Sequence, residues 1–252
     1  MLKRRIIPTL LMKNGMLVKG ERFDSWRRIG PVLPMVRVYE TRGVDELILL
    51  DIGATPEGRG PDMATIAAVA DECMMPLTVG GGIRDLDTIQ ELLRIGADKV
   101  AICTAAMDDP GIIDAAAKRF GSQCITVAID VRHGFAIKRC GTVWVNPASI
   151  SMWSPERLAK GMERMGAGEI LLTSIDKDGT LQGYDLDLIR SVSQAVSIPV
   201  IASGGARDYD DFAAAFEAGA HAVAASALFQ FTESTPLGAK RHLAEQGIPV
   251  RL

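Results

Sequence analysis

The sequence predicts an α/β protein of the (β/α)₈ or TIM-barrel class, and three observations carry this prediction. Short apolar segments of strand length alternate with amphipathic segments of helix length along 252 residues. Most of the short segments are apolar at nearly every position, as in parallel strands that are covered on both faces. The chain also repeats itself, and two similar halves close naturally into one barrel. A doubly wound open sheet is the alternative.

The repeat is clearest at two glycine-rich segments. Residues 76–85 read PLTVGGGIRD, and residues 199–208, which lie 123 positions later, read PVIASGGARD. The same offset relates residues 47–49 (LIL) to residues 170–172 (ILL), and Gly96 to Gly219. Each half therefore contains a strand, a glycine loop, a helix and a further strand, and we predict a barrel built from two duplicated half-barrels.

Eight strands and eight helices follow from the pattern in order. Strands are predicted over 5–11, 46–52, 77–79, 99–102, 124–130, 169–174, 200–203 and 222–225. Helices are predicted over 32–41, 62–73, 85–96, 110–120, 155–165, 186–196, 209–218 and 236–246, with Asp85 as a cap and Gly96 as a stop. We expect residues 12–31 to form a long loop and residues 131–153 an excursion that holds a small hairpin. No linker-like segment interrupts the series, so residues 1–252 are predicted to form a single domain.

Composition excludes several classes of function. The formal net charge of −3 provides no basic face for nucleic acid, and no apolar stretch reads as a membrane span or a signal peptide. Four cysteines without Cys-x-x-Cys spacing and only three histidines predict neither a zinc site nor a disulfide framework. We expect a cytoplasmic protein without metal or cofactor.

Glycine pairs leave two of the predicted strands at the end where such barrels build their active sites. Glycine lets backbone N–H groups approach an anion closely, and a hydroxyl stands at the end of the neighbouring strand in each half. We name these groups the first cradle (Gly81, Gly82 and Thr104) and the second cradle (Gly204, Gly205 and Ser226). They are predicted to bind two phosphate groups. The alternative is that the glycines only make tight turns.

Other polar residues end strands at the same mouth. Asp130 ends the fifth strand and is the candidate general acid or base, whereas Asp51 ends the second and is expected to play a supporting role. Asp178 and Gly179, in the loop after the sixth strand, are candidate substrate contacts, or else part of a solvated turn. Cys103, just before Thr104, is included among the substrate-binding residues.

Four charged residues stand at the starts of predicted strands, at the opposite end of the barrel. They are two cations and two anions, and we name them the charge ring (Arg5, Glu46, Lys99 and Glu169). Ordinary stabilising salt bridges are the usual meaning of charge at that end.

The chain resembles, over essentially its whole length, the cyclase subunit of imidazole glycerol phosphate synthase. The resemblance is carried by a series of segments, among them LVKG at 17–20, TVGGGI at 78–83, GADKV at 96–100, VAID at 127–130, GAGEILLTSID at 166–176 and IASGG at 201–205. It implies a ribulose-type substrate with a phosphate at each end, bound by the two cradles, and no cofactor. It also implies a heterodimer with a glutaminase subunit, whose ammonia enters at the barrel bottom.

Individual residues acquire roles from this resemblance. The charge ring becomes the gate for ammonia, Asp98 a docking contact for the glutaminase, and Lys19 a substrate contact in a mobile first loop. The family uses two aspartates as acid and base, and Asp130 matches one of them. Leu11 stands where the other is expected, and the nearby Asn14 also replaces an acid.

Three hypotheses about function follow. The first is a cyclase of the imidazole glycerol phosphate synthase type, with the cyclisation step weakened by Leu11. The second is a barrel subunit that conducts ammonia for amidination of a sugar in surface-polysaccharide biosynthesis. The third is a related phosphoribosyl isomerase, which also needs two carboxylates but has no use for an ammonia gate.

Overall fold

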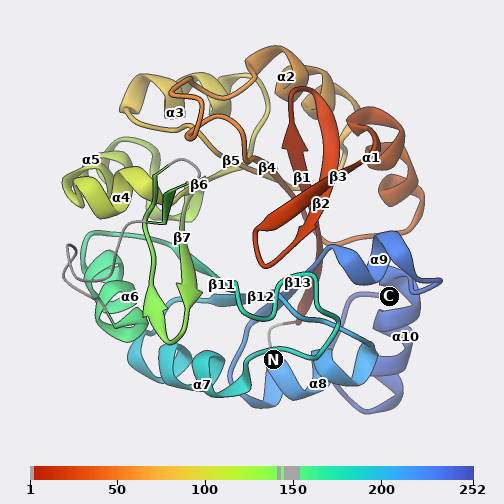
Figure 1. Cartoon of the computed structure of the whole chain (residues 1–252). Coiled ribbons are helices and arrows are strands. Elements are labelled where there is room, and N and C mark those ends of the chain that lie inside the picture. The colour runs from red at the N-terminus through yellow and green to blue at the C-terminus, as the bar shows by residue number, and fades with distance from the viewer. Residues whose placement is uncertain (1–2, 141–142, 145–153) are drawn as a thin grey trace.

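Eight parallel strands form a closed barrel in the computed structural model, which describes residues 3–140, 143–144 and 154–252. Their order around the barrel is β1 (Arg5–Lys13), β4 (Leu47–Asp51), β5 (Leu77–Gly80), β6 (Lys99–Ile102), β7 (Ile125–Arg132), β11 (Glu169–Ser174), β12 (Val200–Ser203) and β13 (Ala222–Ala225). The last strand pairs with the first, from Arg5 beside Ala222 to Pro8 beside Ala225. This closure confirms the predicted barrel and excludes the open sheet (Figure 1).

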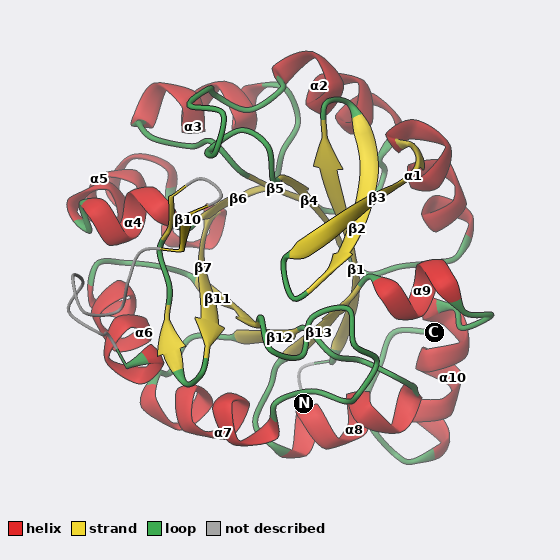
Figure 2. Ribbon diagram, in the orientation of Figure 1, coloured by secondary structure: helices red, strands yellow, loops and turns green. Residues whose placement is uncertain are grey.

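Helices form an outer ring around the strands (Figure 2). The eight predicted helices are present as α1 (Val32–Thr41), α2 (Met63–Glu72), α3 (Leu86–Arg94), α5 (Gly111–Phe120), α6 (Pro155–Arg164), α7 (Leu186–Ala195), α8 (Tyr209–Glu217) and α10 (Pro236–Glu245). Two five-residue helices, α4 (Thr104–Asp108) and α9 (Ala227–Phe231), and a 3₁₀ turn at Ser122–Cys124 were not predicted. Such short elements carry too few residues for a helical period.

The apolar core has two parts because barrel side chains alternate between inside and outside. Ile6 and Leu10 of β1 lie in the large cluster between strands and helices, whereas Ile7 lies in a small cluster inside the barrel. That inner cluster contains Ile7, Ile48, Leu171, Ile201, Ala222 and Ala224. It lies inside the barrel between the two ends, where polar residues collect.

The duplication extends to the element boundaries. Shifting α2, α3, β6 and α4 by 123 positions gives α7, α8, β13 and α9 with identical bounds. The caps repeat as well, since Asp62 and Asp85 cap α2 and α3 just as Asp185 and Asp208 cap α7 and α8. The two half-barrels are therefore related by a pseudo-two-fold operation.

Residues 12–31 are not the long loop that the pattern predicted. Strand β1 runs on to Lys13, and a turn at Asn14 and Gly15, with φ of 52° and 68°, leads into β2 (Met16–Glu21). β3 (Asp24–Pro31) then pairs with β2 in antiparallel fashion. Asn-Gly between apolar runs is a strong hairpin signal, because both residues accept positive φ. We name β2 and β3 the lid hairpin, since they lie across the mouth of the barrel (Figure 1).

The predicted excursion after the fifth barrel strand contains hairpin structure where it is described. β8 (Phe135–Ala136) pairs with the end of β7, and β9 (Arg139–Cys140) pairs with β10 (Val143–Trp144). Residues 141–142 and 145–153 of this excursion lie outside the described residues.

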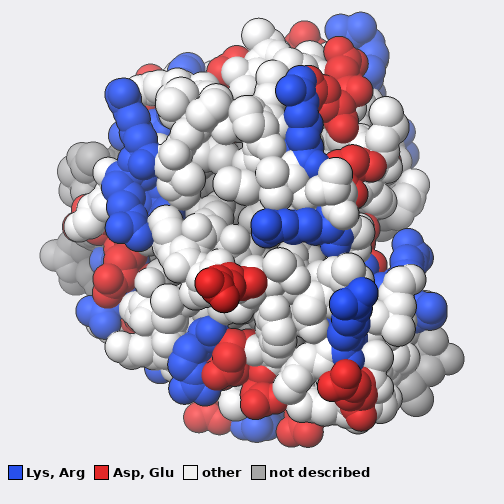
Figure 3. All heavy atoms as spheres, turned by 90° about the vertical axis from the view of Figure 1, so that its right-hand side faces the viewer, with Lys and Arg blue, Asp and Glu red and all other residues white. Residues whose placement is uncertain are grey.

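The outer surface shows no segregation of charge on the side that carries α1 and α10. Figure 3 shows lysine and arginine interspersed with aspartate and glutamate there. Among the described residues, no helix combines the length and the apolar character that crossing a membrane requires.

Candidate functional site

One cavity occupies the mouth of the barrel, at the carboxyl ends of the strands. The eleven residues predicted for substrate binding and catalysis all line it: Lys19, Gly81, Gly82, Cys103, Thr104, Asp130, Asp178, Gly179, Gly204, Gly205 and Ser226. Residues that sequence reasoning missed line it as well, namely Thr173 and Ser203 at strand ends, and Phe23 and Trp26 from the lid hairpin. The two strand-end hydroxyls could have been predicted from their positions in the sequence. The two aromatic residues could have been predicted only if the hairpin had been recognised.

Asp130 and Leu11 face this cavity from opposite sides. They lie on β7 and β1, which are four strands apart in either direction around the barrel. Leu11 is buried and pairs in register with Leu50 of β4. The position equivalent to the Asp130 carboxylate therefore holds an apolar wall that cannot transfer a proton.

Cys103 contacts Asp130 directly. Its Sγ donates a hydrogen bond to Oδ2 of Asp130, with 3.7 Å between the two atoms. Burial and then the neighbouring Asp130 charge raise the pKa of the Cys103 thiol well above its ordinary value. The thiol is consequently a protonated donor at neutral pH and a poor nucleophile.

The cradle glycines adopt backbone conformations that other residues rarely adopt. Gly81 and Gly82 have φ of 101° and 73°, and Gly204 and Gly205 have φ of 90° and 113°. A Cβ added to Gly81 would lie 2.1 Å from the Asp51 carbonyl oxygen. Close packing on the neighbouring strand therefore requires glycine here, which is compatible with both the tight-turn and the anion-binding interpretations.

Lys19 connects the lid hairpin to the loop after β11. Its Nζ lies 2.9 Å from Oδ1 of Asp178, and the lysine side chain is almost fully buried. Oδ2 of Asp178 is also buried and has no protein partner among the described residues. Since a buried acceptor without a donor is costly, this oxygen is suited to a ligand hydroxyl or N–H group.

Asp51 does not offer a free carboxylate to the cavity. Its side chain is fully buried and accepts hydrogen bonds from the Arg59 guanidinium at 2.6 and 2.9 Å and from three backbone N–H groups. The expected supporting role is consistent with these contacts.

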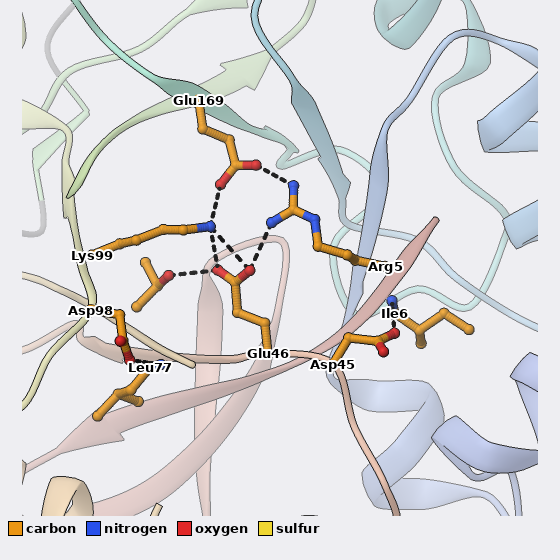
Figure 4. Close-up of polar contacts among 9 residues, drawn as sticks. Arg5, Ile6, Asp45, Glu46, Leu77, Asp98, Lys99 and Glu169 are labelled. Carbon is orange, nitrogen blue, oxygen red and sulfur yellow. Dashed lines mark hydrogen bonds and ion pairs between the residues drawn. The ribbon is translucent and has the colours of Figure 1, made fainter. Parts of the chain in front are cut away.

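The four residues of the charge ring meet at the other end of the barrel (Figure 4). Arg5 binds Glu46 at 2.7 Å and also binds Glu169. Lys99 binds Glu46 at 3.1 Å and Glu169 at 3.0 Å, which closes the ring. The hydroxyl of Thr78 adds a hydrogen bond to Glu46 at 2.7 Å.

Burial makes these ion pairs interdependent. Both carboxylates are buried, whereas Arg5 and Lys99 are about a quarter and a fifth exposed. Burial lowers the pKa of Arg5, but the charges of Glu169 and Glu46 outweigh it and raise the pKa overall. Removing a cation leaves a buried carboxylate poorly compensated, at a cost of about 3–5 kcal/mol for a buried pair.

Asp98 lies beside the ring on the exposed bottom face. Asp98 is an exposed residue, and its Oδ2 accepts the N–H of Leu77 at 2.8 Å (Figure 4). The described residues contain no group of three or more His, Cys, Asp or Glu that could hold a metal ion.

The sequence is similar to those of known proteins over its whole length. The sequence profile described as histidine biosynthesis protein matches residues 5–234. The chain is 46% identical over its whole length to imidazole glycerol phosphate synthase subunit HisF of Hyphomonas neptunium, and 45% identical to the protein of that name from Methanosphaerula palustris, covering 99% of each. It is 44% identical, over the full length of both chains, to the putative imidazole glycerol phosphate synthase subunit hisF2 of Campylobacter jejuni.

Proposed function

Because the chain belongs to the histidine biosynthesis protein family, we propose that it is the cyclase-type synthase subunit of a glutamine amidotransferase that resembles imidazole glycerol phosphate synthase. The observation that carries this proposal is the pairing of two sites in one barrel. A cavity with two cradles and Asp130 lies at the mouth, and the charge ring lies at the opposite end.

The substrate is a ribulose-type molecule with a phosphate at each end. The cradles follow β5 and β12, which are diametrically opposite in the barrel, so a bisphosphate spans the cavity between them. Lys19 and Asp178 provide a charged and a hydrogen-bonding contact beside the second cradle. Asp130 acts as acid or base on the centre of the substrate.

Ammonia enters from the charge ring and moves along the barrel axis. Two hydroxyls support a polar path, since Thr9 and Thr126 are buried and their Oγ1 atoms have no partner among the described residues. Thr9 also lines the mouth cavity. Because the ring is closed by ion pairs on all sides, ammonia passes only when at least one pair separates.

A glutaminase subunit bound at the bottom face supplies the ammonia. The exposed carboxylate of Asp98, next to Lys99 of the ring, is the proposed docking contact. A cytoplasmic location and a single domain over residues 1–252 stay predictions from the sequence.

Turnover with two ammonia sources tests the proposal. Purified protein with the bisphosphorylated ribulosyl substrate and an ammonium salt is expected to form imidazole glycerol phosphate without any glutaminase. Addition of a glutaminase subunit that binds the chain should give glutamine-dependent turnover. Lys99→Met, which removes two of the ion pairs of the ring, should change only the glutamine-dependent rate. Absence of glutaminase binding and of ammonium-dependent turnover would refute the proposal.

Leu11 favours a second candidate, a barrel that conducts ammonia to a sugar amidotransferase in surface-polysaccharide biosynthesis. Loss of one of two proton-transfer groups lowers a rate by about 10²- to 10⁴-fold, and Leu11 is a buried wall of the cavity. In that case the chain binds and stimulates the glutaminase but gives no cyclised product with ammonium salt. The same two assays therefore separate the candidates.

A further inference from the structure

The two cradles are supported by equivalent loops, which follow β4 and β11. Loop 53–62 packs against the first cradle, because a Cβ on Gly82 would lie 2.7 Å from Cβ of Ala54. The Thr55 hydroxyl of this loop also accepts the N–H of Gly82 at 3.2 Å. Loop 176–185 packs against the second cradle, where a Cβ on Gly205 would lie 2.2 Å from the Gly183 carbonyl oxygen. The position of each loop therefore sets the position of the cradle N–H groups.

Asp51 fixes the first of these loops at both of its ends. Oδ1 accepts the N–H groups of Gly53 and Ala54, each at 3.2 Å, and Oδ2 accepts the N–H of Asp62 at 3.2 Å. The Arg59 guanidinium spans both oxygens from the middle of the loop. Charge-assisted, bidentate bonds of this kind are strong and geometrically specific.

The second loop lacks this device. The residue equivalent to Asp51 is Ser174, whose hydroxyl makes one long contact of 3.5 Å with Asp185, and the residue equivalent to Arg59 is Gln182. Loop 176–185 is attached to the lid hairpin instead. The N–H of Arg22 donates to the carbonyl of Asp178 at 2.8 Å, and Lys19 binds the Asp178 carboxylate.

We propose that Asp51 and Arg59 are positioning residues that hold the first cradle ready for an anion, whereas the second cradle depends on the lid hairpin. The inference rests on the proposed function, because it takes the cradles to be phosphate sites. Its consequence is an order of binding. One phosphate of the substrate binds at the first cradle whether the lid hairpin is open or closed, and the other phosphate binds when the hairpin closes.

Titration with inorganic phosphate tests the proposal, with one cradle as the control for the other. Glycine-selective ¹⁵N labelling reports the amides of Gly81 and Gly82 separately from those of Gly204 and Gly205. Arg59→Met should weaken phosphate binding at the first cradle about 10-fold or more, the scale expected when an outer partner of a bound group is lost. Binding at the second cradle should stay within about twofold.

Four further variants sharpen this experiment. Asp51→Asn should act like Arg59→Met, and Arg59→Lys should restore part of the affinity because one charged contact survives. Glu57→Gln is the matched control, because Glu57 also binds Arg59, but at the surface. Lys19→Met should produce the reverse pattern, with weaker binding at the second cradle only.

The outcomes distinguish this inference from its premise. If phosphate shifts no amide resonance at either cradle of the wild-type protein, the cradles are not phosphate sites, and the inference fails with that premise. The inference alone is overturned if the wild type binds phosphate at both cradles but Arg59→Met leaves the affinity of the first cradle unchanged. It is also overturned if Arg59→Met weakens phosphate binding equally at both cradles. If Asp51→Asn does not fold, Arg59→Met decides, since Arg59 is one-third exposed and its replacement leaves the backbone contacts of Asp51 intact.

Discussion

A single residue decides how much chemistry the mouth of this barrel can perform. Asp130 has a thiol on one side and, across the cavity, the apolar side chain of Leu11. The difference between an acid at the end of β7 and an apolar residue on β1 could be predicted, because aligning the two half-barrels pairs Leu11 with Asp130. The thiol contact was not, since it depends on side-chain directions at the ends of β6 and β7.

Leu11→Asp is expected to raise ammonium-dependent cyclase turnover, by about 10²-fold if a missing proton-transfer group is the main defect. The new carboxylate would face Asp130 across the cavity. Leu11→Asn is the control, because it has a similar shape and polarity but does not titrate at neutral pH. Equal rates for the two variants would mean that more than one residue has diverged.

Cys103 should react slowly with iodoacetamide at pH 8, because burial and the Asp130 charge raise the pKa of its thiol. Asp130→Asn removes that negative charge, so the pKa falls and alkylation at a given pH becomes faster. Peptide mass spectrometry between pH 7 and 10 measures this change. Cys73, whose pKa is raised to about 11 mainly by burial, should be unaffected by the substitution. An unchanged Cys103 rate would contradict the assigned contact.

At the scale of elements, the lid hairpin brings residues that follow the first strand into the lining of the cavity. It contributes Lys19, Phe23 and Trp26 to the lining, and it rests on Gly179. A Cβ on Gly179 would lie 2.5 Å from the Gly20 carbonyl oxygen of the hairpin. The loop after β11 can therefore approach the hairpin only because this residue has no side chain.

Gly179→Ala is expected to lift the hairpin from the mouth. It combines a positive φ of 75° with the backbone clash, and its effect should exceed the roughly 1 kcal/mol typical of a left-handed alanine. Gly43→Ala is a matched control, since Gly43 has φ of 60° and open space around its Cα. Faster tryptic cleavage after Arg22 in Gly179→Ala than in Gly43→Ala is the readout. Equal cleavage rates would show that the contact does not hold the hairpin.

The sequence predicted long, buried elements more accurately than short or exposed ones. Buried strands and the eight longer helices were predicted to within a few residues, because a long apolar period is a local signal, as is the aspartate cap of α2, α3, α7 and α8. The lid hairpin was missed because its second strand is mostly exposed and so lacks a clear alternation. Gly81 and Gly204 were found by repetition, whereas the Asp51 network depended on loop geometry that no local pattern encodes.

For the whole molecule, the duplication gave two similar halves that have since diverged in charge. His221 shows this divergence, because it occupies the place that Asp98 has in the first half. Asp98 accepts the N–H of Leu77, and Nδ1 of His221 lies 3.4 Å from the N–H of Val200. A carboxylate and an imidazole thus support equivalent strand starts at the bottom face.

His221 should make the free energy of unfolding depend on pH. Burial, followed by the charges of Arg4 and Arg5, lowers the pKa of His221, although Glu169 opposes this shift. The unfolded state then binds more protons below about pH 6.5, so the His221 contribution to stability is present above that pH and is lost as the pH falls. Urea unfolding between pH 7 and 5 should show a shallower decline for His221→Asn. Parallel curves for the two proteins would contradict this assignment.

The seam of the barrel also constrains synthesis of the chain. Strand β1 pairs with β13, and Arg4 forms a bridge with Val250, so segments that are far apart in the sequence lie side by side. Such long-range closure makes folding slow and leaves strand edges open in the meantime. During translation, the edge of β1 has no native partner on that side until β13 has left the ribosome. The order of the strands therefore leaves one edge of β1 open to non-native pairing until β13 is available.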